Sequence, residues 1–261
     1  MKDNKSEKEL RIYKITDAGP KDNADSCFVV QYGLTAALAC MADGVSSQDK
    51  ASLTSSFITE CVDDWFEEEG ARIFSSDPDT VKDDMLRLTL DIHNDLLAMA
   101  EENPHARFGS TMDLVIIGNR KMFITHVGDS RVYLYDGHDF QKLTEDQTVE
   151  EVEKTSGVRI EIDEKRKAHT LMQCMGAGEV DPYQYEFDVP TTCDILLCTD
   201  GLSNRLKAPD FTKELKKKQT GSDALLALVK MARDRGETDN ITAILIRRRE
   251  KPEKKEKKGK K

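Results

Sequence analysis

The chain has 261 residues, 38% of them hydrophobic, and a formal net charge of −10 at neutral pH. This length suits one large domain, and no repeat or Pro/Gly/Ser-rich linker divides the sequence. No apolar run approaches the roughly 18 residues of a membrane span, and the polar start MKDNKSEKEL has no signal-like apolar segment. We therefore expect a cytoplasmic, monomeric protein with no integral membrane segment.

The charge is unevenly distributed along the chain. Residues 247–261 hold ten Lys or Arg against three Glu, a local charge of +7, so the remaining chain carries −17. An acidic body disfavours nucleic acid, whose phosphates require a basic face, and we expect no nucleic-acid partner. We place the folded domain at residues 1–249 and interpret residues 250–261 as a basic, disordered tail.

Hydrophobic periodicity predicts the elements in chain order. Strands near 11–15, 26–32 and 35–42 precede two long helices, the first with apolar residues every three or four positions from Leu53 to Phe66. The second helix begins at Asp77-Pro78, an acid at the N-cap followed by Pro at the first helical position. On its polar face, or just after it, we place His93 and His105, and we expect structural roles for both.

The second half of the chain is again rich in strands. The pattern predicts strands near 112–118, 121–127 and 130–135, a polar insertion at about 145–180, strands at 183–189 and 193–199, a helix at 222–235 and a strand at 241–247. Strands in runs and helices in pairs differ from regular βαβ alternation. They favour an α+β fold of antiparallel sheets covered by helices.

Four aspartates lie at the ends of predicted strands. Asp43 and Asp200 each follow an apolar strand and precede Gly, Asp129 lies between two strands, and Asp239 comes just before the last strand. One Asp-Gly pair is an ordinary turn signal, but four such acids are too many for independent turns. We expect them to meet at one edge of the sheets.

Clustered carboxylates repel one another unless a cation lies among them. Oxygen-only ligands, without His or Cys, favour a hard ion such as Mg²⁺ or Mn²⁺. Two such ions about 4 Å apart can bridge a water, lower its pKa and direct it at phosphorus. The aspartates therefore predict a metal site suited to hydrolysing phosphoesters.

Five short motifs occur in a characteristic order. They are Ala42-Asp43-Gly44, Gly109-Ser110-Thr111, Gly128-Asp129-Ser130-Arg131, Thr199-Asp200-Gly201-Leu202 and Asp239-Asn240. In this order and spacing the chain resembles the metal-dependent protein phosphatases of type 2C, bacterial members in particular, from Thr16 to Ile246. The resemblance implies two antiparallel β-sheets packed face to face and flanked by pairs of helices, a four-layer αββα sandwich.

The resemblance also implies the activity. It is that of a signalling serine/threonine phosphatase, which hydrolyses phosphomonoesters on phosphoproteins with a water bridged by two Mn²⁺ or Mg²⁺ ions. Asp43 would bridge both metals, the Gly44 carbonyl would bind one, and Asp200 with Asp239 would complete the other site. Asp129, together with Asp200, would hold a weaker third ion. The insertion at 145–180 resembles the family's flap, which shapes substrate access.

The first motif departs from the family pattern R-x-x-N-E-D. In the stretch Gly19–Asp25, Asp25 matches the acid that orders metal-bound waters, Ala24 replaces the Glu, and no Arg is present. Lys21 offers phosphate a point charge but not the bidentate fork of Arg, so we expect weaker phosphate binding.

Two alternatives to an active phosphatase follow from these observations. A catalytically weak pseudophosphatase, acting as a binding or regulatory module, is suggested by Ala24 and the missing Arg. The intact Asp43, Asp200 and Asp239 favour the active enzyme. Another metal-dependent phosphoesterase, such as a nuclease, would share the aspartates, but the acidic body suits nucleic acid poorly.

Overall fold

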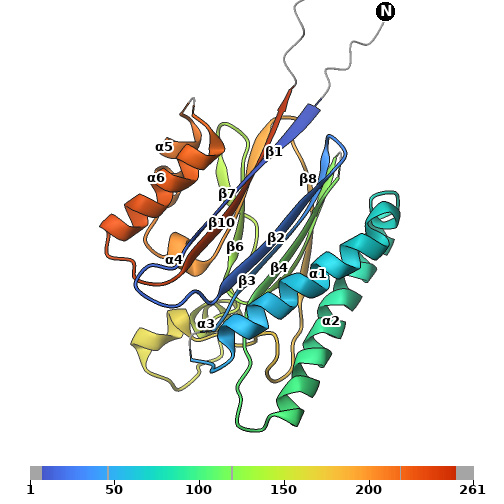
Figure 1. The fold of residues 1–261 in the computed structure, drawn as a ribbon. Coiled ribbons are helices and arrows are strands. Elements are labelled where there is room, and N and C mark those ends of the chain that lie inside the picture. The colour runs from blue at the N-terminus through green and yellow to red at the C-terminus, as the bar shows by residue number, and fades with distance from the viewer. Residues whose placement is uncertain (1–7, 46, 119, 218, 251–261) are drawn as a thin grey trace, which may run out of the picture.

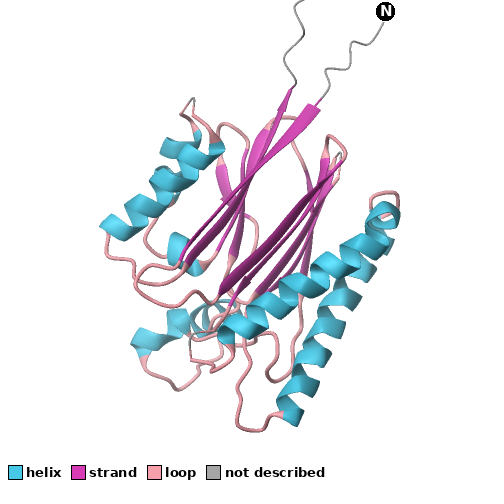
Figure 2. Cartoon of the chain, viewed as in Figure 1, coloured by secondary structure: helices cyan, strands magenta, loops and turns pink. Residues whose placement is uncertain are grey.

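Two five-stranded antiparallel sheets pack face to face, with helices on both outer faces (Figure 1, Figure 2). The structure is a computed structural model and describes residues 8–45, 47–118, 120–217 and 219–250. The first sheet has the strand order β1-β10-β9-β6-β7, and the second has the order β2-β3-β4-β5-β8. This is the architecture expected from the sequence.

In the first half of the chain, two runs of strands flank a pair of long helices. They are β1 (Lys8–Asp17), β2 (Asp25–Tyr32), β3 (Ala36–Asp43), α1 (Ala51–Ile73), α2 (Pro78–Glu102), β4 (Met112–Ile117), β5 (Lys121–Val127), β6 (Arg131–Tyr135) and β7 (Phe140–Lys142). The second half contains α3 (Val149–Ser156), the 3₁₀ helix η1 (Glu164–His169), β8 (Tyr183–Asp188), β9 (Cys193–Cys198), α4 (Asp200–Ser203), α5 (Ala208–Leu215), α6 (Gly221–Asp234) and β10 (Ile241–Glu250).

Alternation along the strands divides the core into layers. In β3, Leu38 and Cys40 pack against the cluster that contains the apolar faces of α1 and α2, while Ala39 and Met41 pack in the cluster between the two sheets. Successive strand side chains point to opposite faces, so a strand covered on both sides is apolar throughout. A third cluster joins the first sheet to α5 and α6.

Local signals position the helices. Asp77 caps α2 by accepting hydrogen bonds from the backbone N–H groups of Asp79 and Thr80, with Pro78 at the first position, as the sequence predicted. Thr220 caps α6 by accepting from the Asp223 N–H. None of the helices in the described ranges combines the length and apolar character needed to cross a bilayer.

Some elements were not expected. The predicted irregular insertion contains α3 and η1, and the strand β7 and the helix α5 were absent from the sequence interpretation. β7 has only three residues and α5 only eight, too short for a clear period. β10 ends at Glu250, and residues 251–261, which include the rest of the predicted basic tail, lie outside the described residues.

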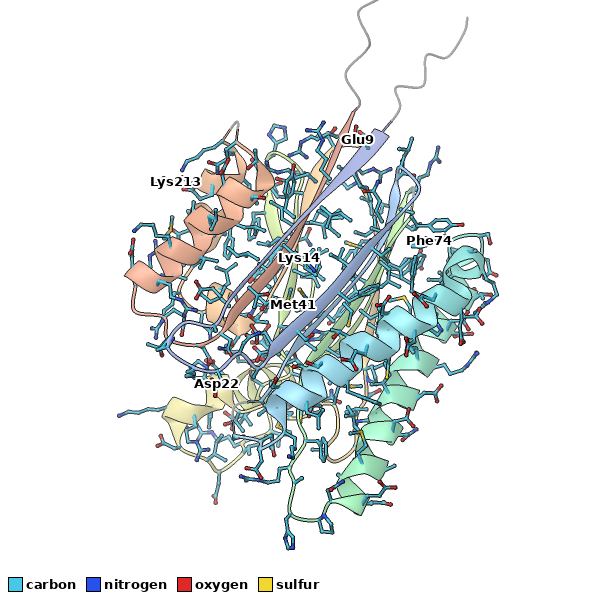
Figure 3. The ribbon with its side chains drawn as sticks, viewed as in Figure 1. Glu9, Lys14, Asp22, Met41, Phe74 and Lys213 are labelled. Atoms are coloured by element: carbon cyan, nitrogen blue, oxygen red, sulfur yellow. The ribbon has the colours of Figure 1, made fainter. Side chains whose placement is uncertain are left out.

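One end of the sandwich gathers the strand ends that carry the sequence motifs. β1 pairs with β10 in antiparallel register, Lys8 opposite Glu250, so both described ends of the chain leave the sheet together. In Figure 3, Glu9 marks that end of the sheets and Asp22 marks the other, below the two sheets and next to the start of α1. The aspartates of the candidate site belong to the end near Asp22.

Candidate active site

Two neighbouring strands place Asp25 and Asp43 side by side. The residues are directly opposite one another in the antiparallel pair β2–β3, Asp25 at the start of β2 and Asp43 at the end of β3. Opposed residues of such a pair project their side chains to the same face of the sheet. The Asp25 charge is, after burial, the first cause that raises the pKa of Asp43.

The electrostatic environment links five aspartates. Burial raises the pKa of Asp43 well above its usual value, and the charges of its acidic neighbours raise it further, in the order Asp25, Asp200 and Asp129. Burial and then the Asp200 charge raise the pKa of Asp129 to about 7. Burial also raises the pKa of Asp200, and the Asp239 charge adds to that effect. Five separate segments of the chain thus bring their acids together.

Thr199 connects the two sheets at this point. Its Oγ1 donates a hydrogen bond to Oδ2 of Asp25 at 3.2 Å and accepts one from the N–H of Thr242 at 3.0 Å. Asp200, the next residue, begins the short helix α4, and its Oδ2 accepts a hydrogen bond from Nδ2 of Asn204 at 2.9 Å. The first sheet thereby presents Asp200 beside the acids of the second sheet.

The glycines that follow Asp43 and Asp200 are required by close backbone approach. A Cβ on Gly44 would lie 2.6 Å from the carbonyl oxygens of Ala24 and Ala51. A Cβ on Gly201 would lie 2.0 Å from the carbonyl oxygen of Asn240. The Asp-Gly pairs are therefore contact points between distant segments, and any side chain at either glycine would push those segments apart.

Asn240 fastens the first motif to the last strand. Its Oδ1 accepts a hydrogen bond from the N–H of Ala24 at 2.8 Å, and its Nδ2 donates to the carbonyl of Ala18 at 2.9 Å. These two hydrogen bonds hold both ends of the segment Ala18–Ala24 at Asn240, so that Lys21 in this segment lies close to Asp239, the residue before Asn240. Nζ of Lys21 donates to Oδ1 of Asp239 at 2.9 Å.

The residues present fit hard divalent cations. The site offers only oxygen donors, and Oδ1 of Asp25 is buried and accepts no hydrogen bond. In the described part of the chain, no three His, Cys, Asp or Glu side chains converge as closely as a formed metal cage requires. Asp239 turns to Lys21 and Asp200 to Asn204, as expected for carboxylates that repel one another and find other partners.

Comparison with known proteins decides the family. A model of the family described as protein phosphatase 2C matches residues 20–243, most of the chain. The chain belongs to this family. The serine/threonine phosphatase stp of Listeria monocytogenes is 28% identical over 214 residues, which cover 80% of this chain and 83% of that protein.

Solved structures show the same fold. The serine/threonine phosphatase Stp1 from Staphylococcus aureus superposes with a TM-score of 0.80 at 23% identity, covering 91% of this chain and 94% of that one. The catalytic domain of the phosphatase PstP, solved with two manganese ions, gives a TM-score of 0.75 at 21% identity, covering 93% of this chain and 99% of that one. The protein is thus a serine/threonine protein phosphatase of the 2C family, which uses divalent metals.

The insertion at about 145–180, which the sequence predicted to be a flap, is attached at two points, called its roots below. Its entry is held by Gln147, whose N–H donates to the Gly128 carbonyl and whose Oε1 accepts from the Gly128 N–H at 2.7 Å. Its return passes through Met175, which exchanges backbone hydrogen bonds with Ser110 at 3.2 and 2.8 Å. Both roots lie next to proposed metal ligands, Gly128 beside Asp129 and Ser110 beside Asp43.

Sequence reasoning did not identify several residues that position the phosphatase site. Arg131 forms a bidentate pair with Asp146 at 2.8–3.1 Å, which holds the turn after Asp129. Thr111 Oγ1 accepts the N–H of Asp43 at 3.0 Å. Arg131 and Thr111 belong to the quoted motifs, and this membership could have indicated that they help to position the site. Asp146 lies outside every motif, so nothing in the sequence indicated its role.

The histidines divide into expected and unexpected positions. His126 is fully buried in β5, and its Nδ1 lies 2.7 Å from Oδ1 of Asp113. The expectation for His93 was wrong, because its side chain is buried and not on a solvated face. His169, in the flap, is exposed, and after the effect of burial its charge is among those that lower the pKa of Asp200.

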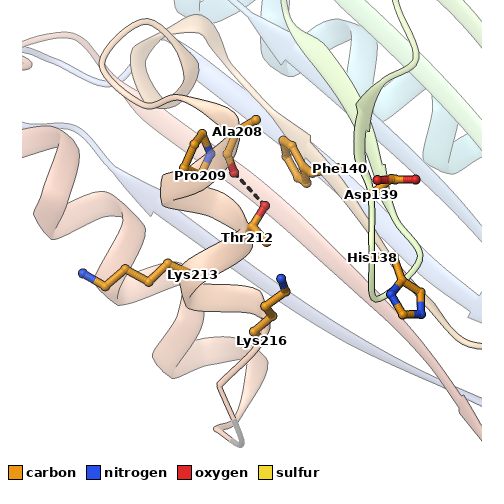
Figure 4. A pocket seen from close by; sticks show the side chains of 8 residues that line it. All are labelled: His138, Asp139, Phe140, Ala208, Pro209, Thr212, Lys213 and Lys216. Carbon is orange, nitrogen blue, oxygen red and sulfur yellow. Dashed lines mark hydrogen bonds between the residues drawn. The ribbon is translucent and has the colours of Figure 1, made fainter.

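A hollow elsewhere on the surface does not belong to this site. A cavity of about 470 Å³ lies between the β6–β7 turn and α5 (Figure 4). Its lining consists of His138, Asp139, Phe140, Ala208, Pro209, Thr212, Lys213 and Lys216. None of the five aspartates lines it, so this cavity is separate from the candidate site.

Proposed function

We propose that this phosphatase hydrolyses phosphoserine and phosphothreonine on proteins with two divalent ions, Mn²⁺ or Mg²⁺, and that Asp43 lies between them. The supporting observation is the mutual elevation of carboxyl pKa values around Asp43 by burial and acidic neighbours. An all-oxygen cluster in which Asp25 and Asp129 are buried is costly unless cations neutralise it. Structures of the family support the same assignment, since PstP was solved with two manganese ions.

Each ligand has a proposed role. Asp43 and the Gly44 carbonyl would hold the first ion, Asp43 with Asp200 and Asp239 the second, and Asp129 with Asp200 a weaker third. Asp25 would order water beside the ions. Bound divalent ions supply a low pKa for water and stabilise charge that develops on phosphoryl oxygens.

The protein's own contacts would fix the geometry of the reaction. The Asp43 backbone is held on both sides, because its carbonyl accepts from the Thr111 N–H at 2.8 Å and from the Ser110 Oγ at 2.9 Å. Its carboxylate is thereby directed toward Asp25 and Asp200. Asp200 is held through its side chain, because Nδ2 of Asn204 donates to its Oδ2.

Lys21 is the proposed contact for substrate phosphate. Its side chain remains 46% exposed beside Asp239, and an ammonium group there can turn to a phosphate brought to the site. A phosphoprotein would approach under the flap, whose two roots lie beside Asp43 and Asp129.

Hydrolysis assays with metal and chelator test this function. The full chain should hydrolyse p-nitrophenyl phosphate and a phosphothreonine peptide with Mn²⁺ or Mg²⁺, and activity should vanish with excess chelator and return with Mn²⁺. Turnover that persists in chelator would refute the role of the metals. Tight Mn²⁺ binding by calorimetry without turnover would instead favour the binding or regulatory module.

A further inference from the structure

His93 lies in the middle of α2 with its side chain 4% exposed. Both ring nitrogens make contacts outside the helix. Nδ1 accepts a hydrogen bond from the Gly176 N–H at 3.1 Å, and Nε2 lies 3.2 Å from the Gly178 carbonyl oxygen. Since Nδ1 accepts, Nε2 must carry the proton and donate, so the two bonds together require a neutral imidazole with its proton on Nε2. Burial lowers the pKa of His93, which favours that neutral form.

The segment held by His93 is the return of the flap. Cys174 and Ala177 form a β-bridge around a tight turn, and Gly176 in that turn has a φ of 84°, in the left-handed region that favours glycine. A Cβ on Gly176 would lie 3.1 Å from the Cβ of Phe108 and 3.3 Å from that of Leu96 in α2. The turn therefore lies directly against the helix that carries His93.

The same turn reaches the active site through one residue. Met175, next to Gly176, exchanges two backbone hydrogen bonds with Ser110, and the Ser110 Oγ donates to the Asp43 carbonyl at 2.9 Å. The contacts run from His93 through the flap return and Ser110 to Asp43. Each step is a hydrogen bond or a peptide link between adjacent residues.

The flap has few other anchors beyond its roots. Most described residues from 150 to 170 are exposed or partly exposed, with Lys167 the only buried side chain among them. Within the flap, entry and return pair with each other, since the Met172 N–H donates to the Gln147 carbonyl. Met175 packs in the apolar cluster that includes Ile92 and Leu96 of α2, and His93 is the polar side chain of α2 that hydrogen-bonds the flap return.

We propose that His93 is a positioning residue that clamps the return of the flap against α2 and so sets how the flap meets a phosphoprotein substrate. The inference rests on the proposed function and adds to it a residue that contacts neither metal nor phosphate. A small phosphoester does not extend to the flap, so its binding does not depend on the clamp, whereas a phosphopeptide spans both the site and the flap.

Variants at two buried positions of α2 distinguish loss of the His93 hydrogen bonds to the flap from a general loss of helix stability. His93→Leu keeps the apolar bulk but removes both hydrogen bonds, and His93→Gln keeps one donor and one acceptor. Thr89→Val is the matched control, because Thr89 is fully buried one turn earlier and its Oγ1 donates only within the helix, to the Met85 carbonyl at 2.9 Å. Gly176→Ala disturbs the same contact from the flap side.

Hydrogen exchange and kinetics on the full chain give the readout. His93→Leu should lose amide protection at residues 172–178 and raise the KM for a phosphothreonine peptide about fivefold, the factor of roughly one hydrogen bond, with little change for p-nitrophenyl phosphate. His93→Gln should recover part of the amide protection and part of the phosphopeptide KM. Gly176→Ala should resemble His93→Leu in both quantities. Thr89→Val should change neither the protection nor the KM.

Two results would overturn the proposal. One is protection at 172–178 that is as high in His93→Leu as in Thr89→Val. The other is an equal loss on both substrates. If His93→Leu does not fold, His93→Gln and Gly176→Ala carry the same comparison. Because exchange is measured without substrate, a chain that lacks phosphatase activity would refute the proposed function while the clamp is still tested.

Discussion

Nζ of Lys21 donates a hydrogen bond to Oδ1 of Asp239 at 2.9 Å, although 218 residues separate them in the sequence. The lysine lies in the first motif, one residue after Pro20, which occupies the position of the arginine in the family pattern, and the aspartate is a proposed metal ligand. Both side chains are more than 40% exposed, so the pair contributes little to stability. Its importance is therefore expected in binding, where one ammonium group can serve either the carboxylate or a phosphate.

Replacement of Lys21 should change substrate affinity and leave the fold intact. Lys21→Met removes the charge and should raise the KM for phosphopeptide about tenfold, the scale of one charged hydrogen bond. Lys21→Arg should lower KM, because a guanidinium grips phosphate at two points. Lys230→Met is the control, since Lys230 forms an exposed ion pair with Asp234 on α6. A KM in Lys21→Met equal to that of the control would exclude Lys21 from phosphate binding.

Asp43→Asn should separate metal binding from stability. Burial and the neighbouring acids disfavour the Asp43 charge, so its removal should raise the melting temperature of the metal-free protein. The same variant should lose tight Mn²⁺ binding and turnover, and with them the stabilisation by bound metal, roughly 2.7 kcal/mol at a hundred times Kd in the wild type. Thermal melts with and without chelator, beside calorimetric titration, measure both effects.

Asp129→Ala should weaken metal binding less than Asp43→Asn does. Because Asp129 is proposed to serve only a third ion, this variant should keep two ions bound while catalysis slows. Calorimetric stoichiometry together with peptide kinetics checks the distinction. The same loss of metal in Asp129→Ala and Asp43→Asn would contradict the assignment of separate roles.

Alanine at either motif glycine should destabilise the protein. The new Cβ would lie 2.0 Å from the Asn240 carbonyl in Gly201→Ala and 2.6 Å from two carbonyls in Gly44→Ala, so each should cost about 1–3 kcal/mol. Gly118→Ala is the control, since its nearest neighbour is the Lys121 carbonyl at an ordinary 3.6 Å. Urea unfolding measures all three. If Gly201→Ala were as stable as Gly118→Ala, the close approach would be wrong.

The pair Asp210–Arg235 should give a pH-dependent contribution to stability. Arg235, and then the N–H of Lys207, hold the pKa of Asp210 at about 2, below the usual 3.8. A lowered carboxyl pKa stabilises the fold above the unfolded value and loses that contribution as pH falls. Asp210→Asn should therefore cost about 1 kcal/mol at pH 7, and the difference should shrink between about pH 4 and pH 2.

Urea titrations at several pH values measure this difference. Asp234→Asn serves as the control, because its ion pair with Lys230 is largely exposed and caps no helix. A cost of Asp210→Asn that stays constant down to pH 2 would show that the carboxylate charge does not contribute.

The sequence by itself determined the strands and long helices, the order of the motifs and the family. These depend on local information: the apolar run of β3, the period-two alternation of β8, the cap at Asp77, and short motifs whose residues are neighbours in the chain. The end of each apolar strand, and so the position of Asp43 and Asp200, could be read directly.

Only the tertiary structure decided which distant groups meet. Thr199 reaches Asp25, Lys21 reaches Asp239, and His93 meets Gly176 and Gly178 because separate segments pack at one end of the sandwich. The sequence shows His93 as polar on a helix, and polar residues are usually solvated. Whether a polar helix face meets water or another segment depends on contacts across many residues, which no local period records.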